Sequence, residues 1–272
     1  MLTDLFFSLF THLAVGLTFL TLFISRDEIG KLYFRVTTGV SFVLLVLALL
    51  SRPFGPIPFI VFFYSDGISF NQKITFLSLV GCAAVLLIYN LLIPRFHKAL
   101  LLTAFLFGLI GICSYAPARF AVGSFNHIES IAAIISGVAA AFILGSVLGA
   151  MITGHWYLVQ HKLSLTPLRR SAILFLTATL LRSLFLLGTV LRNWEVLTTS
   201  PIFTVGNFQN YLFWGRVGIG LMLPLIFGIM IWNSVKIRST QSATGILYAT
   251  VVLVLIGETF ARVLFQISGM PF

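Results

Sequence analysis

Long apolar runs separated by short polar stretches make up most of this chain. Eight such runs predict helices at about residues 4–24, 32–50, 73–94, 98–117, 128–160, 170–191, 208–234 and 244–268. Each run supplies about the 20 mostly apolar residues that a helix needs to cross the hydrocarbon core of a bilayer. The pattern therefore predicts an all-α membrane protein, in which residues 1–272 form one integral domain, a bundle of about eight transmembrane helices.

The stretch between the second and third runs has a different pattern. Residues 51–72 are largely apolar, but Pro53, Pro56, Pro58 and Gly67 interrupt them. The stretch is too short and too often broken to cross a membrane by itself. Its aromatic side chains are of the kind that gather at the depth of the lipid headgroups. We therefore interpret it as an interfacial or re-entrant segment.

The composition excludes a soluble globular domain. Hydrophobic residues make up 59% of the 272 residues, and charged residues make up only 9%. A soluble domain carries about a quarter charged residues.

The distribution of basic residues predicts the orientation. Ten Lys or Arg residues follow the odd-numbered runs and four follow the even-numbered ones. The ten are Arg26, Lys31, Arg35, Arg95, Lys98, Lys162, Arg169, Arg170, Lys236 and Arg238, and the four are Arg52, Lys73, Arg119 and Arg192. Since basic loops stay in the cytoplasm, we expect a multi-pass protein of the inner (cytoplasmic) membrane with both termini on the outer, periplasmic side. The same bias explains the net charge of +10 without a nucleic-acid partner.

Four charged side chains lie inside predicted spans, where lipid disfavours them. They are Arg182, Arg216, Glu258 and Arg262, and His12 and His155 are the embedded histidines. A charge near the centre of a bilayer costs at least about 2.5 kcal/mol, so each such residue is a candidate for function.

Glu258 is the carboxylate around which a site is expected. Arg262 follows it by four residues and therefore lies on the same helix face, one turn away. In the predicted topology, His12 and Arg216 lie at a similar depth in the outer half of the bundle. A carboxylate close to a histidine and arginines can donate and accept protons, as quinone chemistry requires. The alternative is a buried ion pair that only fixes how the helices pack.

The end of the chain resembles a known family of membrane subunits. The stretch from Ile256 to Phe265, with its Gly-Glu followed by an Arg and an aromatic residue, is similar to the last helix of the DMSO reductase membrane anchor. The step Trp214-Gly215-Arg216 resembles the Trp-Arg of the same anchors, and the NrfD/polysulfide reductase membrane subunits have a comparable helix. The similarity is best over residues 208–272, and eight spans with outer termini are also that family's arrangement.

This resemblance implies a haem-free subunit that passes electrons between the quinone pool and a partner protein. The quinone would be menaquinone or ubiquinone, and the partner an iron–sulfur or cytochrome subunit of the same complex. We expect Glu258 and His12 to be catalytic, and Arg216, Arg262, Arg182 and Trp214 to bind the quinone. One departure is that the second and third predicted helices lack the family's histidine and acidic residues. We assign their role to His12 by our own inference, and the resemblance itself does not imply it.

Other functions remain as alternatives. His155 is a candidate ligand of haem b, but a second histidine at the same depth is missing, so haem b is not expected. Cys82 and Cys113 form no CxxC pair, which argues against an iron–sulfur cluster within this chain. A purely structural subunit of an electron-transfer complex also fits the short loops. A transporter is disfavoured, because the second to fourth helices offer few polar side chains to line a path.

Overall fold

The computed structural model describes residues 2–51, 68–92, 96–118, 127–160 and 163–272. Within these residues, eight helices are long and apolar enough to cross a membrane, and no strand occurs. The prediction of an all-α bundle of about eight membrane helices is confirmed. The interfacial segment predicted over residues 51–72 lies mostly outside the described residues, except where α3 ends at Ser51 and α5 begins at Phe70.

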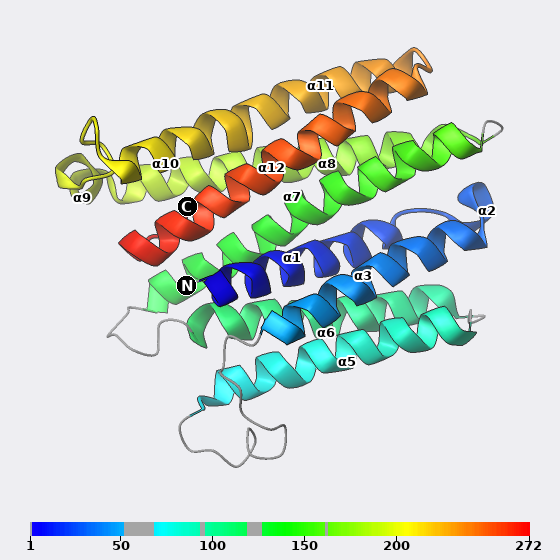
Figure 1. Ribbon diagram of the computed structural model, residues 1–272, viewed down its shortest axis with the longest axis horizontal. Helices are drawn as coiled ribbons and strands as arrows, with labels where there is room; N and C mark the ends of the chain where they lie inside the picture. Colours follow the sequence, from blue (N-terminus) through cyan, green and yellow to red (C-terminus); the bar gives the residue numbers. More distant parts are fainter. Residues whose placement is uncertain (1, 52–67, 93–95, 119–126, 161–162) are drawn as a thin grey trace. The chain divides into compact units, whose positions relative to one another are not determined.

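The chain divides into two compact units. Unit 1 comprises residues 1–23 and 30–141, and unit 2 comprises residues 24–29 and 142–272. Unit 1 contains the spanning helices α1 (Leu2–Leu22), α3 (Lys31–Ser51), α5 (Phe70–Leu92) and α6 (His97–Ala118). The long helix α7 (His127–Val159) begins in unit 1 and continues into unit 2. Figure 1 follows these elements along the chain.

Unit 1 is built on the packing of α5 against α6 and of α1 against α3. Its core contains small and medium-sized side chains from all four helices, among them Ala14, Leu45, Cys82 and Ala104. The buried hydroxyl groups mostly bond to their own helix; Thr18, for example, donates to the carbonyl oxygen of Ala14 at 2.9 Å. In this way a helix buries threonine without leaving a polar group unpaired in an apolar environment.

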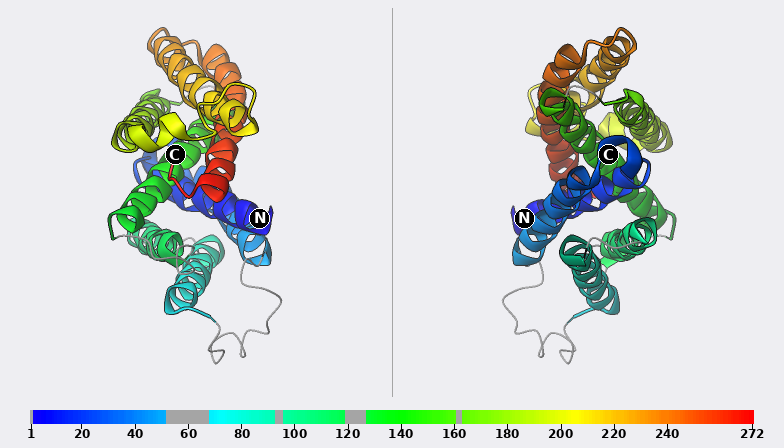
Figure 2. Two further views of the ribbon diagram at one scale, coloured as in Figure 1. Left: turned by 90° about the vertical axis from the view of Figure 1, so that its left-hand side faces the viewer. Right: turned by 90° about the vertical axis from the view of Figure 1, so that its right-hand side faces the viewer.

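Unit 2 contains the short helix α2 (Arg26–Ile29) and the elements of the second half of the chain. These are α8 (Thr166–Arg192), α9 (Trp194–Thr199), α10 (Phe208–Val217), η1 (Gly218–Met222), α11 (Leu223–Lys236) and α12 (Thr240–Ser268). The segments α10, η1 and α11 together make one span, Phe208–Lys236. Helix α12 packs against all three of them, and α11 also packs against α8. Figure 2 gives two further views of these helices.

A π-helical turn, η1, interrupts the seventh span directly before Pro224. Proline lacks a backbone N–H, and its ring clashes with the carbonyl group four residues earlier, which here belongs to Gly220. The wider turn, in which the N–H of Leu223 bonds to the carbonyl oxygen of Gly218, lets the helix continue past the proline. The seventh span therefore continues as one helix with a locally wider turn, which begins two residues after Arg216.

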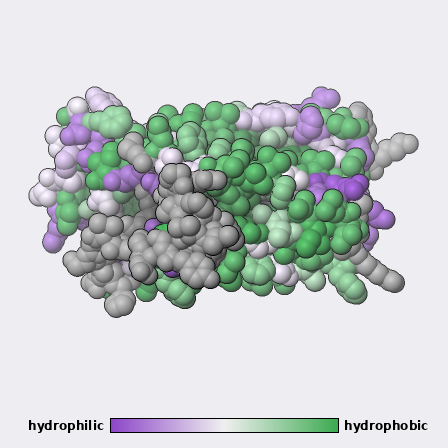
Figure 3. Space-filling view, turned by 60° about the horizontal axis from the view of Figure 1, so that its bottom comes forward, coloured by the Kyte–Doolittle hydropathy of each residue, from purple (hydrophilic) through white to green (hydrophobic). Residues whose placement is uncertain are grey.

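Large hydrophobic side chains are exposed on every spanning helix. Examples, one from each of the eight spans, are Phe6, Val43, Leu77, Leu102, Ile131, Leu184, Ile229 and Val252. Figure 3 shows hydrophobic residues over much of the visible face and hydrophilic residues mainly at its left and right sides. Exposed apolar flanks of this extent are expected where lipid covers the helices.

Candidate functional site

Glu258 lies at the centre of a buried ion-pair cluster in unit 2. Its side chain is fully buried and accepts hydrogen bonds from three guanidinium groups. We call Glu258 together with Arg182, Arg216 and Arg262 the Glu258 cluster. Its members come from α8, α10 and α12, so the cluster joins three helices that are far apart in the sequence.

Each arginine approaches the carboxylate differently. Arg182 uses two donors, Nε to Oε1 at 3.0 Å and Nη2 to Oε2 at 3.3 Å. Arg216 donates from Nη2 to Oε1 at 2.7 Å. Arg262 donates from Nη1 to Oε2 at 3.3 Å and to the Glu258 carbonyl oxygen at 2.8 Å. Both carboxylate oxygens therefore have at least two donors each.

Close contact between two glycines holds α12 against the seventh span. A Cβ atom placed on Gly257 would lie 2.1 Å from the Cα atom of Gly220, so only glycine fits at this crossing. Small residues let membrane helices approach closely where lipid provides no hydrophobic drive for association. Gly257 directly precedes Glu258, and Gly220 lies one turn after Arg216. The glycine contact thus sets the distance that the Arg216–Glu258 ion pair spans.

The Glu258 cluster carries more positive than negative charge. Three guanidinium groups surround one carboxylate, and two of those arginines, Arg182 and Arg216, are at most 2% exposed. In addition, Nε and Nη1 of Arg216 have no hydrogen-bond partner among the described residues. Burying charge is costly unless it is paired and hydrogen-bonded. The two unpartnered nitrogen atoms of Arg216 therefore make the cluster a favourable place for a further hydrogen-bond acceptor.

One acceptor next to the cluster comes from the end of the described chain. Gly269 has a φ of +73°, which ends α12 and turns the following residues back. The carbonyl oxygen of Phe272 then accepts a hydrogen bond of 2.8 Å from Nη2 of Arg182, and that of Pro271 accepts one of 3.2 Å from Thr189. The ring of Phe272 is buried and packs edge-on against Phe213, with 5.8 Å between ring centroids.

An apolar groove of about 520 Å³ lies beside the cluster. We call it the α8–α10 groove, and its lining residues are Ser183, Leu186, Leu187, Val190, Trp194, Phe203, Phe213, Trp214, Val217, Leu221, Met222 and Leu225. Ser183 and Val217 are the immediate sequence neighbours of Arg182 and Arg216. Phe213 belongs to the groove wall and also contacts Phe272, which bonds to Arg182. The groove therefore reaches residues that lie next to members of the cluster in the sequence.

The residues expected at the site do not all lie in the same unit. Arg216, Arg262 and Glu258 come together, and Arg182 joins them directly. Trp214 is 55% exposed and lines the α8–α10 groove.

His12 is buried on α1 in unit 1, where its Nε2 lies near Gly137 of α7. Its expected convergence with Glu258 stays a prediction.

His155 lies on the exposed side of α7. Its Nδ1 shares a hydrogen bond of 2.7 Å with the hydroxyl group of Tyr248. Among the described residues, no three His, Cys, Asp or Glu side chains group together as ligands of a metal ion would.

The ion pair between Arg182 and Glu258 was not predicted from the sequence, although one signal pointed to it. Three arginines and a single carboxylate lie deep in the predicted spans, so all three need the same partner. The groove and the Phe272 carbonyl left no such signal, because apolar residues and backbone groups occur along the whole chain. Comparison with protein-family models, with curated proteins and with solved structures finds no match to this chain.

Proposed function

We propose that this chain is the quinone-binding membrane subunit of a multi-subunit oxidoreductase, with the quinone in the α8–α10 groove. The observation that carries the proposal is an apolar groove of about 520 Å³ beside a buried cluster of three arginines and one carboxylate. An isoprenoid quinone has an apolar tail, a flat ring and two carbonyl oxygens, so it needs both kinds of surface. The resemblance to the DMSO reductase anchors and the NrfD/polysulfide reductase membrane subunits supports the same reading.

The groove suits the ring and the tail of a quinone. Its volume falls in the range of about 300–1,000 Å³ that is common for small-molecule sites. Phe203, Phe213 and Trp214 supply aromatic faces and edges for the ring. Leu187 and Met222 are more than half exposed and line the part of the groove where an apolar tail would leave towards the lipid.

The Glu258 cluster suits the charge that quinone chemistry creates. Reduction places negative charge on the quinone oxygens, and preorganised donors in a water-poor site stabilise developing charge well. Two donor atoms of Arg216 lack a partner among the described residues. The backbone oxygen of Phe272 that bonds Arg182 is an oxygen acceptor, as a quinone carbonyl is. A quinone carbonyl that replaces it would reach the cluster from the groove side.

The geometry favours Glu258 as the residue that orients the arginines. Both of its oxygens already accept hydrogen bonds from guanidinium groups. Proton transfer through Glu258 would therefore require a guanidinium group to move first. Oxidation of a quinol releases two electrons and two protons, so the electrons need a second redox centre. In this proposal an iron–sulfur or cytochrome subunit of the same complex carries it.

Filling the groove tests the proposal. Met222→Phe places a larger side chain in the groove lining, whereas Ile229→Phe makes a comparable change at an exposed position two turns further along the same span. We expect protein purified in mild detergent to retain quinone, and Met222→Phe to lower that content several-fold while Ile229→Phe leaves it unchanged. Extraction with organic solvent and chromatography of the extracted quinone measures this. Equal quinone content in the two variants would contradict binding in the groove.

A further inference from the structure

A second pocket of unit 2 lies at the other end of α12 from Glu258. It has a volume of about 540 Å³, and its lining residues are Tyr157, Leu158, Leu163, Leu165, Arg238, Thr240 and Gln241. Thr240 begins α12, and Glu258 lies 18 residues later on the same helix, which at 1.5 Å per residue separates them by roughly 27 Å. The pocket is therefore distinct from the α8–α10 groove.

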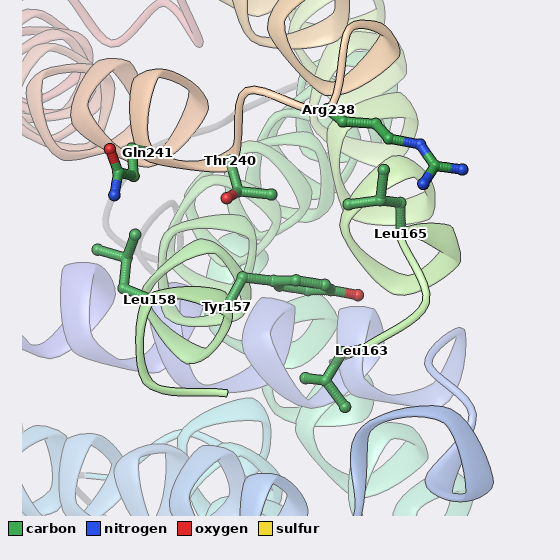
Figure 4. A pocket seen from close by; sticks show the side chains of 7 residues that line it. All are labelled: Tyr157, Leu158, Leu163, Leu165, Arg238, Thr240 and Gln241. Atoms are coloured by element: carbon green, nitrogen blue, oxygen red, sulfur yellow. The ribbon is translucent and has the colours of Figure 1, made fainter. Parts of the chain in front are cut away.

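The pocket has one apolar side and one polar side. Figure 4 shows the ring of Tyr157 lying between Leu158 and the loop that carries Leu163 and Leu165. Tyr157 is held in place because its hydroxyl group donates a hydrogen bond to the carbonyl oxygen of Ser164. Arg238, Thr240 and Gln241 supply the polar groups across from this ring. A ligand that fills the pocket needs both an apolar and a polar part.

Arg238 gives the polar side a positive charge. Its guanidinium group has no hydrogen-bond or ion-pair partner among the described residues, and in Figure 4 its side chain extends over Leu165. No carboxylate is among the described residues that line the pocket. Glu28, a described carboxylate of this unit, bonds Arg170 at 3.1 Å. The charge of the pocket therefore fits an anion.

The surroundings of the pocket are those of a membrane surface. Two cations lie over the ring of Trp232. The Arg169 guanidinium is 5.3 Å from the ring centroid, and Nζ of Lys236 is 5.4 Å from it. Aromatic and basic residues at the ends of spanning helices mark the depth of the lipid headgroups. Ile237 and Val159, the sequence neighbours of the pocket residues Arg238 and Leu158, are 78% and 66% exposed and offer apolar surface to acyl chains.

We propose that this pocket binds the phosphate group of an anionic phospholipid. The phosphate accepts hydrogen bonds from Arg238 and from the polar groups at the start of α12, and the glycerol end of the lipid lies on Tyr157 and the leucines. Basic pockets between membrane helices are suited to lipids with anionic headgroups. A free phosphate ion shares the headgroup chemistry but leaves the apolar wall uncovered.

The test measures binding of short-chain lipids to the purified full-length chain in neutral detergent. Dioctanoyl-phosphatidylglycerol is the anionic probe, dioctanoyl-phosphatidylcholine the zwitterionic one, and inorganic phosphate the third. Arg238→Gln is expected to raise the Kd for phosphatidylglycerol about ten-fold or more, because hydrogen bonds to charged groups are strong. Lys236→Gln removes an equal charge at the same end of the unit, but Lys236 does not line the pocket. It should change the Kd by about two-fold or less, because salt screens distant surface charges.

Three results would overturn the proposal. Equal weakening by Arg238→Gln and Lys236→Gln would mean general attraction to a basic surface. Equal affinity for phosphatidylcholine and phosphatidylglycerol would remove the role of the anionic charge. Displacement of the lipid by inorganic phosphate at the same concentration would identify free phosphate, and not a lipid, as the ligand. Arg238→Lys keeps the charge and should retain most of the phosphatidylglycerol binding if the site is correctly assigned.

Discussion

Glu258 determines where three arginines lie in the apolar interior of unit 2. Arg182, Arg216 and Arg262 all pair with its carboxylate, so the loss of that group would remove a negative partner from three buried guanidinium groups at once. Such a cluster is not an efficient way to stabilise a fold, because apolar residues of similar size often do as well or better. Its presence beside a groove therefore fits a role in ligand binding.

We expect Glu258→Gln to destabilise the protein strongly. Removing one partner of a buried ion pair costs about 3–5 kcal/mol, and here one change removes the partner of three arginines. The matched control is Glu195→Gln, the same chemical change at an exposed carboxylate of α9, which should have little effect. The free energy of unfolding in detergent or bicelles measures both.

A second variant separates stability from quinone binding. Adding Arg216→Met to Glu258→Gln removes one uncompensated charge and should recover part of the lost stability. If the Glu258 cluster only fixes helix packing, quinone content should recover together with the fold. We expect quinone binding to stay low, because the double variant lacks the donors of Arg216. Full recovery of quinone content would refute a direct role of this cluster.

Among the helices, the predicted and observed ends differ in a way that shows what hydropathy detects. It locates the apolar run and not the whole helix. The predicted spans end within four residues of the helices, and the largest differences are at the starts of α8 and α12. Helix α8 begins at Thr166 rather than near residue 170, because Pro167 is well tolerated in the first helical turn. Helix α12 begins at Thr240 rather than 244. In both cases the first turn is polar, so it is helical without belonging to the apolar run.

The glycine contact between η1 and α12 should tolerate no added side-chain atom. Gly257→Ala places a Cβ atom 2.1 Å from the Cα atom of Gly220, so the two backbones must move apart. We expect a loss of stability of about 1–3 kcal/mol, as for other overpacked cores, and a loss of bound quinone as Arg216 moves away from Glu258.

Gly245→Ala provides the control on the same helix, because nothing lies within 4 Å of the added atom. It should leave stability and quinone content nearly unchanged. Equal behaviour of the two variants would mean that the close approach of η1 and α12 does not hold the Glu258 cluster.

At the scale of the whole molecule, the basic residues predict the orientation in the membrane. The ten basic residues after odd-numbered runs should lie in the cytoplasm, and the four after even-numbered runs outside. Cysteines introduced by Ser239→Cys and Ser124→Cys, in a chain with Cys82 and Cys113 replaced by alanine, test this. A membrane-impermeant maleimide should label Ser124→Cys in intact cells and Ser239→Cys only after permeabilisation. Labelling of both from the same side would reject the topology.

By itself, the sequence determined the helical class, the number of membrane spans and the unusual charges within them. These properties are local, since lipid demands a continuous apolar stretch of fixed length and makes each embedded charge conspicuous. Helical periodicity also placed Glu258 and Arg262 on one face.

Only the tertiary structure decided that Arg182 joins Glu258, that Gly220 touches Gly257, and that Phe213 of the groove wall packs against Phe272. These contacts join segments many residues apart. They depend on how the helices rotate and cross and on the left-handed turn at Gly269, which no repeating pattern along the chain encodes.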